Sequence, residues 1–209
     1  MVLRRRGGRP DRAEAGALGQ AILDAAEATF LADGFNGASM EAIATMAGTT
    51  KQTLYARFGS KAALFVEVSN RLLTGRFTPA PAGTMSLREA LVEVSEQALT
   101  AMLDPRLVRM HCIITAEAAR FPELARLTDA DEHFPGRAII CALLADAQRS
   151  GEISCGDVRQ AMLLLQDMVL ASPLRAASLG LATFGPEECR ARACYAVDTF
   201  LNGVLSRSG

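Results

Sequence analysis

The sequence predicts an all-α protein on the strength of three observations. Residues that favour helices, above all Ala, Leu, Met, Glu and Arg, dominate the 209-residue chain. Clusters of β-branched residues with a period of two, which would indicate half-buried strands, are scarce. Half of the residues are apolar, enough for a substantial core, and many recur with the spacing of one helix face. We therefore expect helices throughout and almost no sheet.

The beginning of the chain predicts a flexible basic arm over residues 1–12. Gly7, Gly8 and Pro10 oppose regular structure there. Its clustered arginines are Arg4, Arg5, Arg6 and Arg9. Residues 1–62 hold eight Lys/Arg against six Asp/Glu, whereas the rest holds fourteen against seventeen. A basic front on an acidic body is expected where only the front meets a polyanion, although a tail that merely aids solubility gives the same excess.

One apolar stripe predicts the first helix, from about Ala13 to Ala32. The stripe consists of Leu18, Ile22, Ala26 and Phe30. Gly34 follows as a glycine C-cap. A second helix is expected after Ser39, which can cap it, and Glu41 is favourable in its first turn because of the helix dipole.

The stretch from Ser39 to Lys61 has the size pattern that two short, tightly crossed helices need. Ala44 is small where the helices would approach, and Gly48 can adopt the positive φ of a sharp turn. Leu54 and Phe58 repeat at helical spacing and would fill the wedge between the two helices. These residues predict a helix-turn-helix.

The second helix of this pair has a face suited to DNA. Thr49 and Thr50 lead into it, and Gln52, Thr53 and Tyr55 lie on the side away from its apolar face, with no acid among them. The major groove of DNA accepts one α-helix and offers base-edge acceptors and thymine methyl groups to such a face. We therefore interpret this helix as the one that reads base pairs.

A fourth, longer helix is expected after Ser60, which can cap it. Its apolar residues are Leu64, Phe65, Val68, Leu72 and, at the end, Phe77. Lys61 lies in its first turn, where the helix dipole disfavours a cation by about 0.3–1 kcal/mol. A DNA phosphate beside Lys61 would remove this cost, and a solvated lysine that tolerates it is the plain alternative.

The segment TPAPAGTMS, residues 78–86, predicts a linker between a small front domain and a larger body. We expect the basic arm at 1–12, a helix-turn-helix domain with its connecting helix at 13–77, and a helical body at 78–209. Prolines and glycines divide the body into helices near 86–103, 106–120, 136–150, 157–179 and 186–205.

The chain lacks the motifs of most enzymes. It has no glycine-rich phosphate loop, no H-E-x-x-H and no G-x-S-x-G, and two histidines are too few for most acid-base chemistry. His111 and His133 have no metal-ligand spacing, so we expect neither a metal nor a cofactor. The sequence therefore argues against an enzyme.

The cysteines and the apolar runs predict a cytoplasmic protein. Five cysteines without a C-x-x-C pair indicate buried free thiols: Cys112, Cys141, Cys155, Cys189 and Cys194. No apolar core follows the first arginines, as a targeting segment would require. The longest apolar run, residues 138–145, is too short to span a bilayer.

The segment ILDAAEATFLADGFNGASMEAIATMAGTTKQTLYARFGSKAALF resembles the TetR family of transcriptional regulators. The resemblance covers about residues 22–65 and lies in the order and spacing of Phe30, Gly34-Phe35, Ile43-Ala44, Ala47-Gly48, Lys51, Thr53-Leu54-Tyr55, Phe58 and Ser60-Lys61. In the body, ITAEAARFPELAR at residues 114–126 resembles the C-terminal domain of the AefR-like branch. Two positions depart from the family pattern: Thr49 stands where valine is frequent, and Ala63 replaces the acid of a capping box.

This resemblance implies an all-α homodimer whose last two long helices form a four-helix bundle with those of the partner. On this chain the helices would be about 157–179 and 186–205. They carry apolar stripes of Met162, Leu165, Met168 and Val169 and of Ala193, Val197, Phe200 and Leu201. Packing within one monomer would produce the same stripes, so both readings stay open.

The family's DNA-contact positions correspond to Ser39, Thr50, Lys51, Gln52, Thr53, Tyr55 and Lys61. We assign Lys51, Tyr55 and Lys61 to DNA phosphates. Gln52 and Thr53 are assigned to base edges, because Gln can pair with adenine and a Thr methyl can meet thymine. Gly8-Arg9-Pro10 resembles the minor-groove arms of many members, and Arg4, Arg5 and Arg6 would add phosphate contacts.

The resemblance also implies a ligand pocket enclosed by the middle helices. Its candidate walls are Met110, Ile113, Ile114, Glu117, Phe121, Phe134, Met162 and Gln166. Met and Phe offer adaptable apolar surface, and Glu117 or Gln166 would orient a polar atom of a largely apolar effector. Residues of these types are more often simply part of the core.

Together these features predict a ligand-responsive DNA-binding regulator with a double-stranded operator and a small-molecule effector as partners. The expected mechanism is repression: a homodimer binds a palindromic operator, and effector binding in the body moves the two heads out of register. A constitutive DNA-architectural or scaffolding module, which uses the same helix-turn-helix without an effector, is the alternative.

Overall fold

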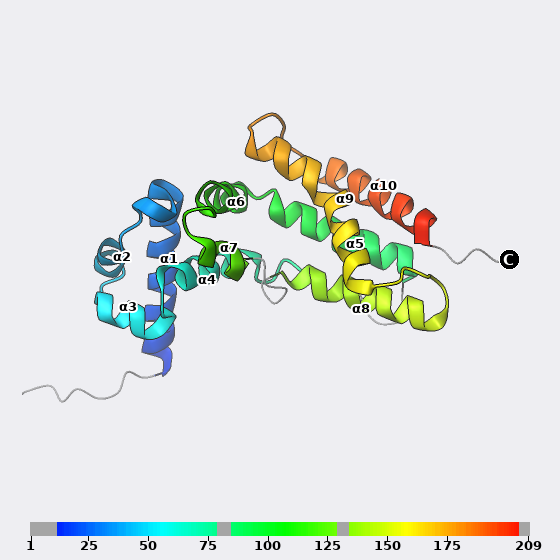
Figure 1. Ribbon diagram of the computed structural model, residues 1–209. Coiled ribbons are helices and arrows are strands. Elements are labelled where there is room, and N and C mark those ends of the chain that lie inside the picture. The colour runs from blue at the N-terminus through cyan, green and yellow to red at the C-terminus, as the bar shows by residue number, and fades with distance from the viewer. Residues whose placement is uncertain (1–11, 79–84, 129–133, 205–209) are drawn as a thin grey trace, which may run out of the picture. The chain divides into compact units, whose positions relative to one another are not determined.

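The computed structural model describes residues 12–78, 85–128 and 134–204 (Figure 1). Their helices are α1 (Arg12–Gly37), α2 (Met40–Met46), α3 (Lys51–Phe58), α4 (Lys61–Leu73), α5 (Leu87–Met102), α6 (Pro105–Glu117), α7 (Pro122–Thr128), α8 (Pro135–Ser150), α9 (Val158–Ser178) and α10 (Pro186–Val204). These described residues contain no strand, and the predicted all-α fold is confirmed. The chain divides into two compact units, Met1–Val68 and Ser69–Gly209.

An aromatic cluster forms the centre of the first unit. The Phe30 ring lies 5.0 Å from Phe65, edge to face, and 6.2 Å from Phe35, in a stacked pair. Phe35 and Phe65 close the triangle at 5.7 Å. All three rings are buried, together with Ile22 and Ile43, so the residues of α1, α2 and α4 pack on one core.

The first helix is longer than we expected, because it does not stop at Ala32. It reaches Gly37, but Gly34 interrupts it with φ 71° and ψ −179°. The break turns the chain so that Phe35 returns to the core beside Phe30. Gly34 therefore does interrupt the long apolar helix, and one further turn follows it.

In the second unit, α5 packs against α8, α9 and α10, and α9 packs against α6, α8 and α10 (Figure 1). Its core consists largely of aliphatic side chains from α5, α8, α9 and α10. The fully buried members include Leu91, Leu99, Leu144, Leu165 and Val197. The body is thus a helical bundle held by side chains at helical spacing.

Two predictions for the helices were wrong. The fourth helix ends at Leu73 and does not continue to Phe77, because the Arg76 N–H bonds the Leu73 carbonyl in a turn. Phe77 packs edge-on against Phe134 at 5.6 Å. Helix α7 was not expected, since Phe121-Pro122 looked like a break, whereas Pro122 starts a short helix.

The five cysteines are free thiols. Only Cys189 is buried, and the other four are half-buried. The prediction that all five thiols are buried was therefore correct for Cys189 alone. Within the described ranges, no helix is both long and apolar enough to cross a membrane.

Candidate nucleic-acid interface and ligand site

The turn between α2 and α3 forms as the sequence predicts for a helix-turn-helix. Gly48 has φ 65°, and the Thr49 N–H donates to the Ala44 carbonyl at 2.9 Å. Ala44 and Leu54 are buried, Leu54 completely. The small side chain lets the two helices approach, while Leu54 anchors α3 and leaves its opposite face in solvent.

Two of the predicted contact residues begin the helices of this pair. Ser39 caps α2, where its Oγ accepts a hydrogen bond from the Ala42 N–H at 3.4 Å. Thr50 caps α3, where its Oγ1 accepts from the Thr53 N–H at 3.2 Å and lies 2.9 Å from the Thr53 hydroxyl. Each cap satisfies a backbone donor that has no partner within the helix, so these side chains also fix where each helix starts.

The exposed face of α3 presents Lys51, Gln52 and Tyr55 to solvent. Tyr55 is 43% exposed, which is unusual for an aromatic residue in a core-forming helix. The Lys51 Nζ lies 6.0 Å from the centre of the Tyr55 ring. The side chain of Gln52 makes no hydrogen bond within the described part of the chain, so its amide is open to an external partner.

Glu41 is a residue of this surface that the sequence interpretation missed. Its Oε1 forms an ion pair with the Lys51 Nζ, and its Oε2 accepts a hydrogen bond from the Ser39 hydroxyl at 3.2 Å. The hydrogen bond from Lys51 lowers the pKa of the Glu41 carboxyl, and the same contact raises the pKa of Lys51. We had considered Glu41 only as a first-turn acid of α2. The tight turn after α2 was the signal that could have placed it beside Lys51, ten residues later.

Lys61 has protein partners in place of the phosphate that its sequence position suggests. Its Nζ donates to the carbonyls of Asn36 and Ala38 at 3.4 and 3.1 Å and lies 4.7 Å from the Phe35 ring centre. These carbonyls offset the unfavourable helix dipole at the start of α4. The Ser60 hydroxyl caps the same turn by accepting the Ala63 N–H at 3.0 Å. A phosphate contact of Lys61 stays a prediction.

Arg57 connects α3 to α1. Its Nη1 donates to the Ala15 carbonyl at 3.0 Å. Gly19 makes room for the guanidinium, because a Cβ at that position would lie only 2.3 Å from Nη2. Sequence reasoning did not identify this pair, whose members are far apart in the chain. The arginines of the arm, Arg4, Arg5, Arg6 and Arg9, lie outside the described residues.

The predicted ligand walls separate into two groups. On α6, Met110 and Ile113 are buried, and Ile114 and Glu117 are half-buried. The second group lies at the start of α8 and on α9, where Met162 is buried and Phe134 and Gln166 are half-buried. Phe121 belongs to neither group: it is half-buried and lies between α6 and α7.

Arg137 links two of these candidates and was missed by the sequence interpretation. Its Nε donates to Gln166 Oε1 at 2.9 Å, and its guanidinium lies 5.9 Å from the Phe134 ring centre. Phe77 packs edge-on against Phe134, and Gly136 leaves space for the Phe77 ring. This cluster of Phe77, Phe134, Arg137 and Gln166 combines aromatic surface with directed polar groups.

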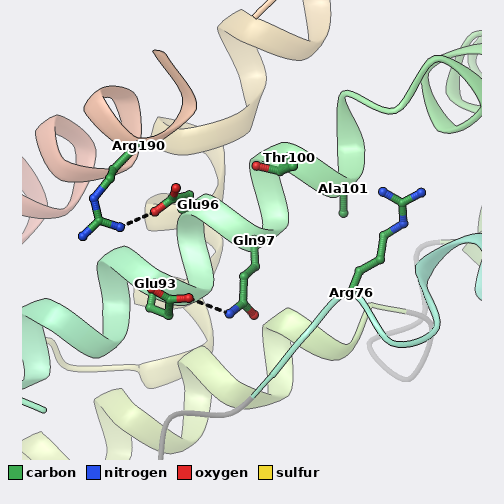
Figure 2. Close-up of a pocket in the computed structure, with 7 residues that line it drawn as sticks. All are labelled: Arg76, Glu93, Glu96, Gln97, Thr100, Ala101 and Arg190. Carbon is green, nitrogen blue, oxygen red and sulfur yellow. Dashed lines mark hydrogen bonds and ion pairs between the residues drawn. The ribbon is translucent and has the colours of Figure 1, made fainter. Parts of the chain in front are cut away.

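A polar cleft of about 410 Å³ lies elsewhere in the body, on α5 and α10 (Figure 2). Its lining residues are Arg76, Glu93, Glu96, Gln97, Thr100, Ala101 and Arg190. Arg190 donates to Glu96 at 2.5 Å and Gln97 donates to Glu93 at 2.9 Å, as Figure 2 shows. None of the predicted ligand walls lines it, and because its charged groups largely satisfy one another, we assign no ligand to it.

Comparisons with protein families match both units. A model described as bacterial regulatory proteins, tetR family, matches residues 22–68. A second model, the C-terminal domain of AefR-like transcriptional repressors, matches residues 89–203. No curated protein matches the chain in a sequence search.

Solved structures give the same result. A TetR-family transcriptional regulator from Mesorhizobium loti MAFF303099 is 26% identical with a TM-score of 0.72, over 94% of this chain and 100% of that one. The flavonoid-responsive regulator FrrA is 29% identical with a TM-score of 0.74, over 92% and 100%. A TetR family regulator from Pseudomonas syringae pv. tomato str. DC3000, 24% identical with a TM-score of 0.68 over 90% and 97%, shares the fold.

Proposed function

Because this chain belongs to the TetR family of bacterial transcriptional regulators, with a body of the AefR-like type, we propose that it is a ligand-responsive repressor. In this proposal a homodimer binds a palindromic operator and leaves it when a small molecule binds the helical body. The observation that carries the proposal is the solvent-facing surface of Lys51, Gln52 and Tyr55 on a helix anchored by buried Leu54.

The residues of this surface divide into two roles on DNA. Lys51, Tyr55 and Lys61 contact phosphates and fix the position of the head. Gln52 and Thr53 meet base edges, and the open amide of Gln52 suits the N6 and N7 atoms of adenine. Ser39 and Thr50 cap the two helices and lie at their ends, where a phosphate can also approach.

The homodimer rests on different residues from those of the predicted stripes. Met162, Leu165, Val169, Ala193, Val197, Phe200 and Leu201 are buried in the core of the monomer, with Met168 partly buried against it. Leu164 on α9 and Tyr195 on α10 are instead 61% and 69% exposed. Large exposed apolar side chains on these two helices support a partner helix packed there.

The effector is proposed to be a largely apolar small molecule with a hydrogen-bonding group. Phe134 offers it an aromatic face, and Gln166 and Arg137 offer directed polar atoms. A flavonoid is the first class to test, because FrrA is named for its response to flavonoids. The effector must bind the released state more tightly than the DNA-bound state, and a difference of about 1–3 kcal/mol relieves binding roughly 5–150-fold.

Fluorescence anisotropy tests this proposal directly. Labelled duplexes from the intergenic DNA beside the gene, each containing an inverted repeat, are compared with random duplexes at low salt. Half-sites about 34–36 Å apart, or a multiple of this distance, are expected to bind preferentially. A panel of flavonoids and other apolar compounds is then added to the complex. A chain that binds no fragment better than random DNA contradicts the regulator, whereas operator binding that no compound relieves favours a constitutive DNA-architectural module.

A further inference from the structure

One carboxylate connects two residues that are proposed to contact DNA. Glu41 takes the Lys51 ammonium on Oε1 and the Ser39 hydroxyl on Oε2, 3.2 Å away. The side chains of Lys51 and Glu41 are 48% and 64% exposed, so a DNA backbone can reach both of them. The contact joins the start of α2 to the start of α3.

The chemistry of this arrangement matches that of a phosphate contact. A phosphodiester carries one negative charge over two non-bridging oxygens, as a carboxylate carries one over its two oxygens. Lysine ammonium and serine hydroxyl groups are common donors to DNA phosphates. Glu41 therefore offers Ser39 and Lys51 the charge and the acceptors that DNA would offer them.

We propose that Glu41 is an intramolecular competitor of DNA phosphate, and this inference rests on the proposed DNA-binding function. In the free protein its carboxylate holds Ser39 and Lys51. In the complex a phosphate takes over Lys51, and Glu41 is left exposed beside the DNA backbone. Glu41 lowers the affinity for every duplex alike, because the exchange involves the backbone and not the bases, and so limits binding to non-operator DNA.

The exchange has a measurable signature in salt. A lysine that neutralises a phosphate contributes about 0.9 to the slope of log K against log salt. When Lys51 leaves Glu41 to reach the phosphate, the freed carboxylate attracts a cation, and this cancels most of that contribution. Glu41→Gln should therefore steepen the slope by up to about 0.9. The ratio of the variant's affinity to that of the wild type then falls by up to about 3.5-fold between 50 and 200 mM salt.

The experiment measures binding of the full-length chain to an operator fragment and to a random duplex at 50 and 200 mM salt. Glu41→Gln is expected to tighten binding to both duplexes by about two- to fivefold at 50 mM, since exposed pairs contribute little. In a Lys51→Ala background the same change should tighten binding much less, because it then removes only the repulsion between Glu41 and the DNA backbone. Glu67→Gln is the matched control, because Glu67 is an exposed acid of the same unit that belongs to α4 and not to α2 or α3.

Each result decides the question. Tighter binding and a steeper slope for Glu41→Gln, absent from Glu67→Gln and much reduced in the Lys51→Ala background, support the competitor. If the wild type binds DNA and Glu41→Gln binds it no more tightly, this inference is overturned while the proposed function stands. An equal gain from Glu67→Gln also overturns it, because net charge then explains the result. If wild type binds neither duplex, the proposed function falls first. Glu41→Ala repeats the test should the Gln variant fold poorly.

Discussion

Replacing Gly48 tests whether the turn of the helix-turn-helix depends on backbone conformation alone. Gly48 has φ 65°, and a Cβ added there would meet no atom within 4 Å. Gly48→Ala therefore introduces no clash, and its whole effect comes from holding an L-residue in the left-handed region, which costs about 1–2 kcal/mol. Gly48→Asn should lose less, because asparagine tolerates this conformation better.

Hydrogen exchange measured by mass spectrometry gives the local free energy of opening for residues 39–61. A loss of about 1–2 kcal/mol lowers the protection of these amides roughly 5–30-fold. Gly16→Ala is the control, because Gly16 lies in α1, also has no atom within 4 Å of a Cβ, and has no positive φ. That change should stabilise α1 by about 0.5–1 kcal/mol. Equal or greater protection in Gly48→Ala would refute the argument from φ.

Four further predictions concern other contacts. Burial would raise the pKa of Asp104, but hydrogen bonds from its two arginine partners outweigh this and lower its pKa to about 2. A carboxyl group whose pKa is lowered by folding stabilises the protein at pH values above its unfolded pKa, near 4, and this stabilisation is lost as the pH falls towards 2. In urea unfolding, Asp104→Asn should therefore lower the free energy of unfolding by about 1–2 kcal/mol at pH 7 and by almost nothing near pH 2. Lys61→Ala should weaken binding to all duplexes in anisotropy titrations and also lower the melting temperature, because it loses its carbonyl contacts. Gln52→Ala should cost about 1–3 kcal/mol at one base pair only, and equal losses on operator and random DNA would remove its assignment to a base. Gly19→Ala displaces the Arg57 guanidinium, and the helix propensity of alanine offsets the lost bond, so the free energy of unfolding should change by under about 1 kcal/mol. Arg57→Ala should then add nothing in the Gly19→Ala background.

Local signals were sufficient for most of the fold. Ser39 caps the helix that it was expected to cap, Thr50 caps the helix into which it was expected to lead, and Gly48 supplies the turn between them. These features depend on a residue's own chemistry and on neighbours within a few positions. Helix α7 was missed because its local signals are ambiguous. It has only seven residues, and proline occurs both where a helix breaks and at the first position of a helix, as Pro122 does here.

Side-chain partners were harder to predict than helices. The sequence indicated that Lys61 needs an acceptor, but the carbonyls of Asn36 and Ala38 become that acceptor only after the break at Gly34. Arg137 has no distinctive sequence motif, and its bond to Gln166 depends on how α8 packs on α9. Such contacts depend on tertiary packing, which the periodicity of apolar residues does not reveal.

The apolar stripes of the last two helices show a related limit. Periodicity identified Val197 and Leu165 as members of a buried face, and both are fully buried. It did not distinguish the monomer's own core from a partner, because both are apolar environments with the same spacing. The residues that bear on a dimer are the exceptions to the stripe, such as Leu164, and only their exposure in the folded monomer identifies them.

The charges of the first unit suggest how affinity and specificity are divided between its parts. On α3, Lys51 is offset by Glu41, Gln52, Thr53 and Tyr55 are neutral, and the Arg57 guanidinium donates to the Ala15 carbonyl. A surface with so little net charge attracts DNA weakly over a distance but can discriminate among base edges. Arg4, Arg5 and Arg6 have no acid close to them in the sequence, since the first acid is Asp11. The salt-dependent attraction to DNA should therefore come mainly from the arm, and the choice of base pairs from α3. With this division, α3 adds little to the affinity for DNA of any sequence.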